Sequence, residues 1–345
     1  MKSIKEADVK GKKVLMRCEF NVPLDENGKI LDDYDLRRTI PTIEYLVKRE
    51  ARLILMSHLD SPGGKVVENL RLTPVQERLF GYLDMSISKA PDCIGTNIKE
   101  MVDSLIPGEV LLLENLRFHE EEEENDEDFA KELSSLGDIF VNEAFGVCHR
   151  AHASIVGVPK HLPSYAGLLL EEEVRTLGRV MESPGRPLVA IFGGAKAETK
   201  IPAIKKFLEI ADSVLVGGKI SLELEEMKMS HRKLVLPEDY NQNFDIGDKT
   251  IKKFKEVINE AATIVWNGPM GYLEKEEFEK GTREIAKAIA ESKAFKVAGG
   301  GETSLAIEKY GIGGKIDFVS IGGGAMLQFL AGDRLPGLEV LSFYQ

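Results

Sequence analysis

Short apolar runs alternate with amphipathic stretches along the whole chain, and this alternation is the feature that most limits the fold. Runs at 14–20 and 52–58 have the length and composition of buried strands. Stretches with helical periodicity come after them at 35–50 and 72–83, and the same order recurs in the second half. Such alternation is typical of parallel sheets covered by helices on both faces. We therefore predict an α/β protein with two doubly wound, Rossmann-like parallel-sheet domains joined by a hinge helix.

The length of 345 residues favours two domains over one. The boundary is expected at 160–188, where a charged helical stretch at 168–183 is ended by Pro184 and Gly185. The expected parts are an N-terminal domain over 1–165, an interdomain helix over 166–186, a C-terminal domain over 187–330, and a segment over 331–345 that returns to the N-terminal domain.

Charge and cysteine content exclude several classes of protein. The formal net charge of -12 argues against nucleic acid as a main partner. No apolar run approaches the roughly 20 residues that a membrane span needs, and the first residues lack the apolar core of a secretory signal. The three cysteines have no CxxC spacing and are interpreted as reduced thiols. We expect a cytoplasmic monomer whose partners are small molecules, with no nucleic-acid and no membrane partner.

The two halves of the chain differ in the residues at the ends of their strands. In the first half the apolar runs end in basic side chains, and in the second half they end in glycines, at 193–194, 217–218, 268–271, 299–301 and 322–324. Ligands of parallel α/β sheets bind at the carboxyl ends of strands. Basic side chains there suit a small anion, whereas glycines let the backbone approach phosphates. A phosphate donor facing an anionic acceptor is the arrangement of a small-molecule kinase.

The glycine junctions are accompanied by Lys196 and Lys200, whose charges suit a phosphoryl group in transfer. For a single junction, a tight turn with surface lysines is the simpler interpretation, but five junctions in one domain favour phosphate binding. The usual mononucleotide motifs are missing: there is no GxxxxGK[ST], and no GxGxxG opens a helix after the first strand. A nicotinamide-dependent enzyme is therefore disfavoured.

The basic group at the strand ends of the first half suits a small, multiply charged anion, because arginine binds carboxylate and phosphate bidentately. Salt bridges and capping histidines are the alternative for any one residue. Asn21 and Asn115 could add amide donors, and the acidic run Glu120–Glu124 is interpreted as a solvated helix start. The basic group comprises Arg17, His58, Arg117, His149, Arg150 and His152.

Several segments resemble the phosphoglycerate kinase family, in the family's order, from about Lys12 to Leu341. They read FNVPL, MSHL, EVLLLENLRFH, HRAHAS, FGGAK, WNGPMG, GGGE and IGGGA. The resemblance implies two doubly wound domains that close about a hinge. It also implies a glycolytic and gluconeogenic, ATP-binding transferase, which reversibly transfers a phosphoryl group between 1,3-bisphosphoglycerate and ADP to give 3-phosphoglycerate and ATP, with Mg²⁺. The N-terminal domain would then bind a 3-phosphoglycerate-type anion and the C-terminal domain the nucleotide.

The resemblance also implies roles for individual residues. Catalytic roles would fall to Lys196, Lys200 and Arg150, and Glu302 would act on magnesium indirectly, through the nucleotide. The 3-phosphoglycerate site would comprise Arg17, Glu19, Asn21, His58, Arg117 and Arg150. The nucleotide site, with Glu274 at the ribose hydroxyls, would comprise Gly193, Ala195, Lys196, Lys200, Gly217, Gly218, Asn267, Pro269, Gly271, Glu274, Gly300, Glu302 and Thr303.

The chain departs from the family pattern at charged positions. Asp35 and Ser61 stand where the family has arginines, and Asp60 where it has glycine; Arg38 could partly replace the arginine lost at 35. Glu19, Glu143 and Glu302 stand where it has aspartates, Ile321 replaces a threonine, and a segment is missing after Gly218. Losing one contact with developing charge typically costs ~3–4 kcal/mol in the transition state.

Two hypotheses remain open from the sequence. The first is a working, divergent kinase of this family, supported by Lys196, Lys200 and the glycine junctions. The second is a non-catalytic or repurposed paralogue that binds nucleotide but has lost the normal acceptor site, through Asp35, Asp60, Ser61 and Glu302.

Overall fold

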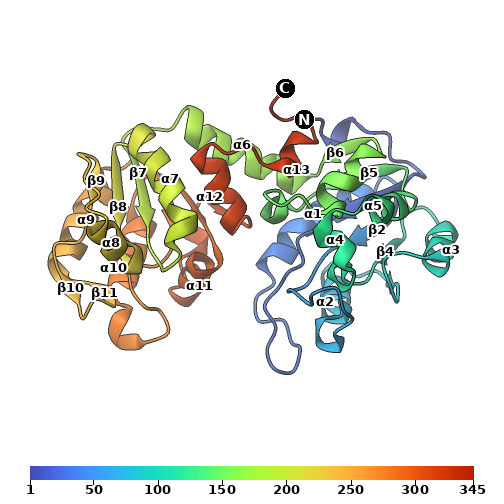
Figure 1. Ribbon diagram of the computed structural model, residues 1–345, viewed down its shortest axis with the longest axis horizontal. Coiled ribbons are helices and arrows are strands. Elements are labelled where there is room, and N and C mark those ends of the chain that lie inside the picture. The colour runs from blue at the N-terminus through green and yellow to red at the C-terminus, as the bar shows by residue number, and fades with distance from the viewer. The chain divides into compact units, whose positions relative to one another are not determined.

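The computed structural model describes residues 1–345, which form two compact units (Figure 1). Unit 1 comprises Met1–Val174 and Arg334–Gln345, and unit 2 comprises Arg175–Asp333. Helix α6 (Leu168–Glu182) carries the chain from unit 1 into unit 2. None of the helices has the length and apolar character needed to cross a lipid bilayer.

Unit 1 is built on a six-stranded sheet in the order β3–β4–β2–β1–β5–β6, in which every neighbouring pair is parallel. Strands β2, β3 and β4 lie on one side of β1, and the chain then crosses to form β5 and β6 on the other side. The switch point therefore lies between β1 and β5. The strands are β1 (Lys13–Arg17), β2 (Arg52–Met56), β3 (Ile87–Lys89), β4 (Val110–Leu112), β5 (Ile139–Asn142) and β6 (Ser164–Ala166).

Helices cover both faces of this sheet. Successive side chains of a strand point to opposite faces, and in β1 both faces carry apolar, buried side chains. Val14 and Met16 of β1 belong to the core cluster that includes Leu36, whereas Leu15 belongs to the cluster that includes Phe129. The helices of unit 1 are α1 (Tyr34–Val47), α2 (Thr73–Leu83), α3 (Thr96–Ser104), α4 (Glu120–Glu124), α5 (Glu127–Ser134) and α13 (Pro336–Glu339).

Unit 2 repeats the design with a second parallel six-stranded sheet, in the order β14–β13–β12–β7–β8–β9. The switch point of this sheet lies between β7 and β12. The strands are β7 (Leu188–Phe192), β8 (Ser213–Val216), β9 (Leu234–Val235), β12 (Thr263–Asn267), β13 (Phe295–Gly299) and β14 (Phe318–Ser320).

The helices of unit 2 likewise lie on both faces of its sheet. Ile191 and Trp266 pack in the cluster that contains Phe254 of α9, whereas Phe192 points the other way and contacts Phe207 of α7 with ring centroids 5.6 Å apart. The predicted doubly wound α/β fold is thereby confirmed. The helices are α7 (Ala197–Ile210), α8 (Gly218–Glu226), α9 (Asp248–Glu260), α10 (Lys280–Glu291), α11 (Gly301–Lys309) and α12 (Gly323–Ala331).

The stretch at 219–248, which has little pattern in the sequence, is only partly regular. After α8 the chain forms the short edge strand β9 and a two-stranded antiparallel ribbon of β10 (Tyr240–Asn241) and β11 (Asp245–Ile246). Asp245 of this ribbon is buried and accepts the Gly281 N–H over 2.7 Å, which ties the ribbon to α10.

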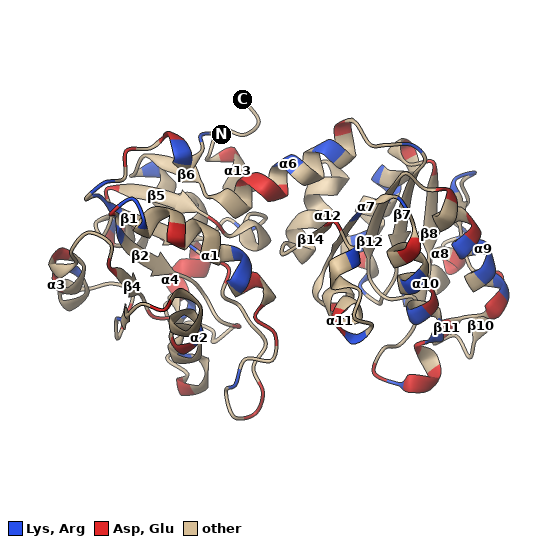
Figure 2. Cartoon of the chain, turned by 180° about the vertical axis from the view of Figure 1, so that it is seen from behind, with Lys and Arg blue, Asp and Glu red and all other residues tan.

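Charges on the solvent side of unit 2 alternate in sign (Figure 2). Ion pairs such as Lys253–Glu238 and Lys280–Asp248 join residues of and around α9 and α10. Such exposed pairs contribute little stability, and their mixed signs fit a solvated surface.

Candidate functional site

The predicted site residues gather in two regions, one in each unit. Arg17 ends β1 and the loop after β5 holds 143–152, so the basic group lies around the switch point of unit 1. Gly193 comes directly after β7 and Gly268 directly after β12, so the glycine group lies at the switch point of unit 2. Each region is where an open α/β sheet binds ligands.

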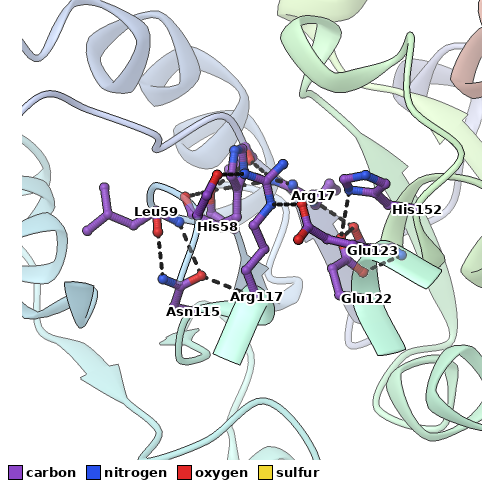
Figure 3. A network of polar contacts seen from close by, with 12 residues as sticks. Arg17, His58, Leu59, Asn115, Arg117, Glu122, Glu123 and His152 are labelled. Carbon is purple, nitrogen blue, oxygen red and sulfur yellow. Dashed lines mark hydrogen bonds and ion pairs between the residues drawn. The ribbon is translucent and has the colours of Figure 1, made fainter. Parts of the chain in front are cut away.

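Arg17 is the centre of the unit 1 region. Its side chain is fully buried, although arginine is rarely buried unless its donors are satisfied. Nε donates to the Ser154 hydroxyl over 2.9 Å, one terminal nitrogen donates to the Cys18 carbonyl, and the other lies 3.0 Å from Nδ1 of His58 (Figure 3). Arg17 is therefore a fixed part of the site.

Glu122 supports this arrangement from α4. Its buried carboxylate accepts the backbone N–H of Ser154 over 2.9 Å and the Ser154 hydroxyl over 2.6 Å. The interpretation of Glu120–Glu124 as a wholly solvated helix start was wrong for this residue, because the side chain of Glu122 turns inward toward Arg17 (Figure 3). The sequence carries no signal that separates it from the four neighbouring glutamates.

Arg117 is also largely buried and is held by the chain itself. It donates to the Asp60 carbonyl over 2.8 Å, and its Nε lies 3.3 Å from Oε1 of Glu123 (Figure 3). The Ser61 hydroxyl lies 3.4 Å from the same guanidinium. Asp60 thus meets Arg117 through its backbone, and Glu123 partly neutralises the charge of Arg117.

The histidines of the region do not add positive charge at neutral pH. Burial and the nearby arginines lower the pKa of His58 well below its ordinary value and lower the pKa of His152 to about 4. Burial, with Arg150, also lowers the pKa of His149. The charge available to an anion comes from the arginines alone, a distinction that the sequence pattern could not make.

Glu19 is the carboxylate that faces those arginines, and Asp35 lies near enough to Glu19 to be affected by its charge. Glu19 is buried and its Oε2 has no hydrogen-bond partner, while burial raises its pKa. Burial and the charge of Glu19 raise the pKa of Asp35 well above its ordinary value. Arg38 does not compensate, because it donates to Glu172 over 2.7 Å and to the Tyr34 hydroxyl over 2.9 Å.

The remaining predicted residues of unit 1 fall into two groups. Arg150 and Asn21 are exposed to solvent, and Asn21 accepts the Asp60 N–H over 2.8 Å. Asn115 is fully buried and its amide donates to the carbonyls of Leu59 and Leu70, over 2.8 and 3.0 Å. Asn115 therefore shapes the loop after β2 and has no amide donor left for a ligand.

In unit 2 the glycine junctions let the backbone of neighbouring strands approach closely. Gly193 donates to the Asn267 carbonyl over 2.9 Å and Gly194 to the Pro269 carbonyl over 2.8 Å. A Cβ on Gly193 would lie 2.0 Å from the Pro269 oxygen, and Gly268 has a φ of +94° that side chains rarely adopt. These positions require glycine for the frame of the site.

Lys200 points inward from the first turns of α7. Its buried Nζ donates to the Gly193 carbonyl over 2.5 Å and lies 3.8 Å from Oε2 of Glu302. Burial lowers the pKa of Lys200. Lys196, at the N-cap of the same helix, is exposed. One lysine is thus held in place and the other reaches solvent.

Asn267, Thr303 and Gly300 join the ends of β12 and β13. The Asn267 amide donates to the Gly299 carbonyl over 2.7 Å, and the Thr303 hydroxyl accepts the Gly268 N–H over 2.7 Å. Oδ1 of Asn267 is buried without a partner in the protein. A buried acceptor without a partner is uncommon and is the kind of group that a ligand or bound water satisfies.

A cavity of about 940 Å³ opens beside this frame. It is large enough for a small organic ligand. Gly194 of the first glycine junction lines it, together with the predicted nucleotide-site residues Ala195, Gly218, Pro269, Gly271, Glu274 and Glu302.

Other walls of the cavity are apolar and were missed by the sequence reasoning. Phe244, Tyr272 and Leu305 line it, and their side chains are exposed to the extent of 55%, 44% and 56% of the residue surface. Exposed large apolar side chains gathered at one place are a mark of a binding site. Nothing in the sequence separates them from ordinary core residues.

Comparison with known proteins identifies relatives over nearly the full length. A sequence model of the family described as phosphoglycerate kinase matches residues 4–233 and 223–333. The phosphoglycerate kinase of Aquifex aeolicus is 42% identical over 386 aligned residues, covering 98% of this chain and 97% of the relative. That of Pelotomaculum thermopropionicum is 41% identical over 388, covering 99% and 98%. The alignments exceed the length of this chain, so the relatives contain residues that this chain lacks.

Solved structures give the same result. Phosphoglycerate kinase from Pyrococcus horikoshii superimposes with a TM-score of 0.89 at 32% identity, covering 99% of this chain and 98% of that structure. The enzyme from Coxiella burnetii gives a TM-score of 0.84 at 33% identity, covering 99% of both.

Two doubly wound sheets, one with arginines and the other with a glycine-framed cavity near its switch point, fit a phosphotransferase, and these relatives identify one. The chain belongs to the phosphoglycerate kinase family. The comparisons support the kinase hypothesis and give no support to the alternative of a repurposed paralogue.

Proposed function

We propose that this protein reversibly transfers a phosphoryl group between 1,3-bisphosphoglycerate and ADP, giving 3-phosphoglycerate and ATP. The observation that carries the proposal is the pair of ligand regions at the two sheet switch points. Unit 1 offers arginines to an anion, and unit 2 offers a glycine frame with a buried lysine beside a cavity. We further propose a monomer in the cytoplasm with small-molecule ligands only.

Unit 1 would bind the phosphoglycerate. Arg17 and Arg117 are held rigidly by Ser154 and the Asp60 carbonyl, and rigid donors lose little entropy when an anion binds. Arg150 is exposed and could close over the ligand. Neutral His58 and the exposed Asn21 would add hydrogen bonds to hydroxyl or carboxylate groups.

Unit 2 would bind the nucleotide. The apolar walls formed by Phe244, Tyr272 and Leu305 suit a base, and Glu274, which lines the same cavity, would accept the ribose hydroxyls. The backbone around Gly194 and Gly300 would receive the phosphates, with support from the N-terminus of α11.

Magnesium fits this region through Glu302. Its side chain is about half exposed at the first turn of α11 and lies at the cavity wall beside Lys200. Mg²⁺ prefers carboxylate, phosphate and water oxygens, so Glu302 would hold it through the phosphates of the nucleotide or through water. When bound, the ion would neutralise charge on those phosphates.

The chemistry asked of the protein is positioning and charge stabilisation. An acyl phosphate is already reactive, and no general base is required at the attacking phosphate oxygen of ADP. Lys200 would hold the charge of the phosphoryl group close to Gly193, and the exposed Lys196 would follow that group as it moves. In-line transfer requires the two bound ligands to meet, and the proposed hinge closure would bring them together.

The deciding experiment is a coupled turnover assay in both directions, with Lys196→Ala and the exposed control Lys205→Ala. We expect turnover in the wild type and the control, and a loss of at least about a hundredfold in Lys196→Ala with an unchanged circular dichroism spectrum. Absence of turnover in the wild type, with Mg-ADP still bound by calorimetry, would overturn the kinase proposal.

A further inference from the structure

A cluster of three potential metal ligands lies in unit 1, and the proposed phosphotransfer does not use it. Asp92 and Cys93 are in the loop between β3 and α3, and His119 is the residue before α4. The side chains offer a carboxylate oxygen, a thiol sulfur and an imidazole nitrogen that all lie within 4.8 Å of one another. From this convergence we propose that Asp92, Cys93 and His119 form a binding site for Zn²⁺ or a similar borderline-soft divalent ion.

The chemistry of the three donors selects the ion. Sulfur and imidazole ligands favour zinc and its neighbours in the transition series over Mg²⁺ and Ca²⁺, which prefer oxygen donors only. A thiolate, a carboxylate and a neutral imidazole carry two negative charges between them, which balance a divalent cation. Three protein ligands leave a fourth tetrahedral position for water.

The donor atoms lie within 4.8 Å of one another and would have to rearrange to hold the ion. Metal–ligand bonds of roughly 2.0–2.3 Å place tetrahedral ligand atoms about 3.3–3.7 Å apart. Nε2 of His119 and Oδ1 of Asp92 are 2.7 Å apart, joined by a hydrogen bond. The Asp92 side chain is 48% exposed and that of His119 is 24% exposed, so both can separate by several tenths of an ångström around the fixed, buried sulfur of Cys93.

A simple ion pair between Asp92 and His119 accounts for only part of this arrangement. Asp92 also accepts the Cys93 backbone N–H over 2.7 Å. The Cys93 sulfur lies within 4.8 Å of the ligand atoms of both partners, which an ion pair alone does not require. The ring of His119 is oriented by Phe129, with ring centroids 5.4 Å apart, which restricts the imidazole to this corner.

The cluster lies where a bound ion would stabilise the position of α4. His119 is the N-cap residue of α4, and α4 carries Glu122 and Glu123, which hold Ser154 and Arg117. An ion bound by His119 and by the loop before α3 would fasten α4 to that loop. The site would thus act as a clamp on the support of the arginine region.

The test is titration of the chelator-treated full chain with Co²⁺, whose thiolate complexes show a sulfur-to-metal charge-transfer band in the near ultraviolet. We expect one equivalent of Co²⁺ to give this band and Zn²⁺ to abolish it by competition. Cys93→Ser and His119→Gln should lose the band, and Asp92→Asn, at a half-exposed position, should weaken Co²⁺ binding about tenfold or more. Cys148→Ser removes a thiol that is also buried and free, and should keep the band.

Each other outcome would overturn the proposal. If the wild-type protein binds no Co²⁺, Asp92 and His119 form an ion pair only. If it binds Co²⁺ without the sulfur band, the ion is held adventitiously by surface histidines. A band that survives in Cys93→Ser, or disappears in Cys148→Ser, belongs to another thiol. Should Cys93→Ser fail to fold, the response of Asp92→Asn decides, because unchanged Co²⁺ affinity there removes the carboxylate from the site.

Discussion

The Nε–H of Arg17 donates to the Ser154 hydroxyl over 2.9 Å, and that hydroxyl donates in turn to the Glu122 carboxylate over 2.6 Å. The serine thus links a buried positive charge to a buried negative one. We expect Ser154→Ala to free Arg17 to reorient and to leave one oxygen of Glu122 without its partner. Hydrogen bonds to charged groups contribute about 1.5–3 kcal/mol.

Steady-state kinetics in both directions would measure the effect of Ser154→Ala. The KM for 3-phosphoglycerate should rise roughly ten- to a hundredfold, with a smaller effect on the KM for Mg-ADP. Ser135→Ala, an exposed serine whose hydroxyl bonds only within its own turn, is the matched control. Equal rises in both KM values would show a general loss of structure instead.

Lys200 is predicted to act on the transferring phosphoryl group. Lys200→Ala should lower kcat at least about a hundredfold, because the contact is aimed at developing charge, while changing Mg-ADP affinity less than tenfold. Lys205→Ala, on the exposed side of the same helix, should leave kcat within about twofold of wild type. If Lys200→Ala changed affinity and kcat by the same factor, the lysine would be a ground-state binding residue.

Asp35 and Ser61 are predicted to weaken the acceptor site. Asp35→Arg combined with Ser61→Arg should lower the dissociation constant for 3-phosphoglycerate by tenfold or more, measured by calorimetry, because the net change is toward positive charge beside an anion. Glu100→Arg, on the exposed surface of α3, changes the formal charge by two units at a distance, against three for the double variant. If Glu100→Arg raised the affinity for 3-phosphoglycerate equally, the effect would come from the net charge of the protein and not from positions 35 and 61.

Glu143 is predicted to make stability depend on pH. Its buried carboxylate accepts the N–H groups of Leu169 and Leu170 over 3.1 and 3.3 Å and a hydrogen bond from Thr42, yet burial dominates and raises its pKa to about 7. Because the pKa of Glu143 is higher in the folded state than in the unfolded state, its contribution to the free energy of unfolding is fully present below about pH 4.5. That contribution is lost as the pH rises through about 7.

The comparison that isolates this effect is Glu143→Gln against wild type, by chemical unfolding at about pH 5 and about pH 8. The variant cannot ionise at position 143. Its free energy of unfolding, relative to that of wild type, should therefore be higher at about pH 8 than at about pH 5, by up to about 3 kcal/mol. A constant difference would mean that the hydrogen bonds to Leu169 and Leu170 offset the cost of burying the charge.

The fold was predictable because each apolar run marks one strand and each periodic stretch one helix. The glycine junctions were predictable for a related reason: a position such as Gly193, where a Cβ would strike the Pro269 oxygen, has no alternative to glycine. The sequence pattern predicted basic residues at or just beyond strand ends. Arg17 does end β1, whereas Arg117 and Arg150 lie in the segments that follow β4 and β5.

Properties that depend on packing between distant segments were beyond the sequence. Glu122 is buried and its neighbour Glu123 is not, although the residue type is the same. Burial is the main cause of the low pKa of His58 and of His152, and arginines such as Arg17 and Arg117, which lie far away in sequence from His152, add to it. Phe244 and Tyr272 have the residue types of core positions, and only the folded chain shows that they line a cavity.

The return of residues 334–345 to unit 1 has a consequence for biosynthesis. Gly337 donates to the Cys148 carbonyl over 2.9 Å, and the amino group of Met1 donates to the Ser342 carbonyl over 3.1 Å. A ribosome makes all of unit 2 before it makes these residues. The domain that begins first is therefore completed last, and the nascent chain holds an unfinished unit 1 throughout the synthesis of unit 2.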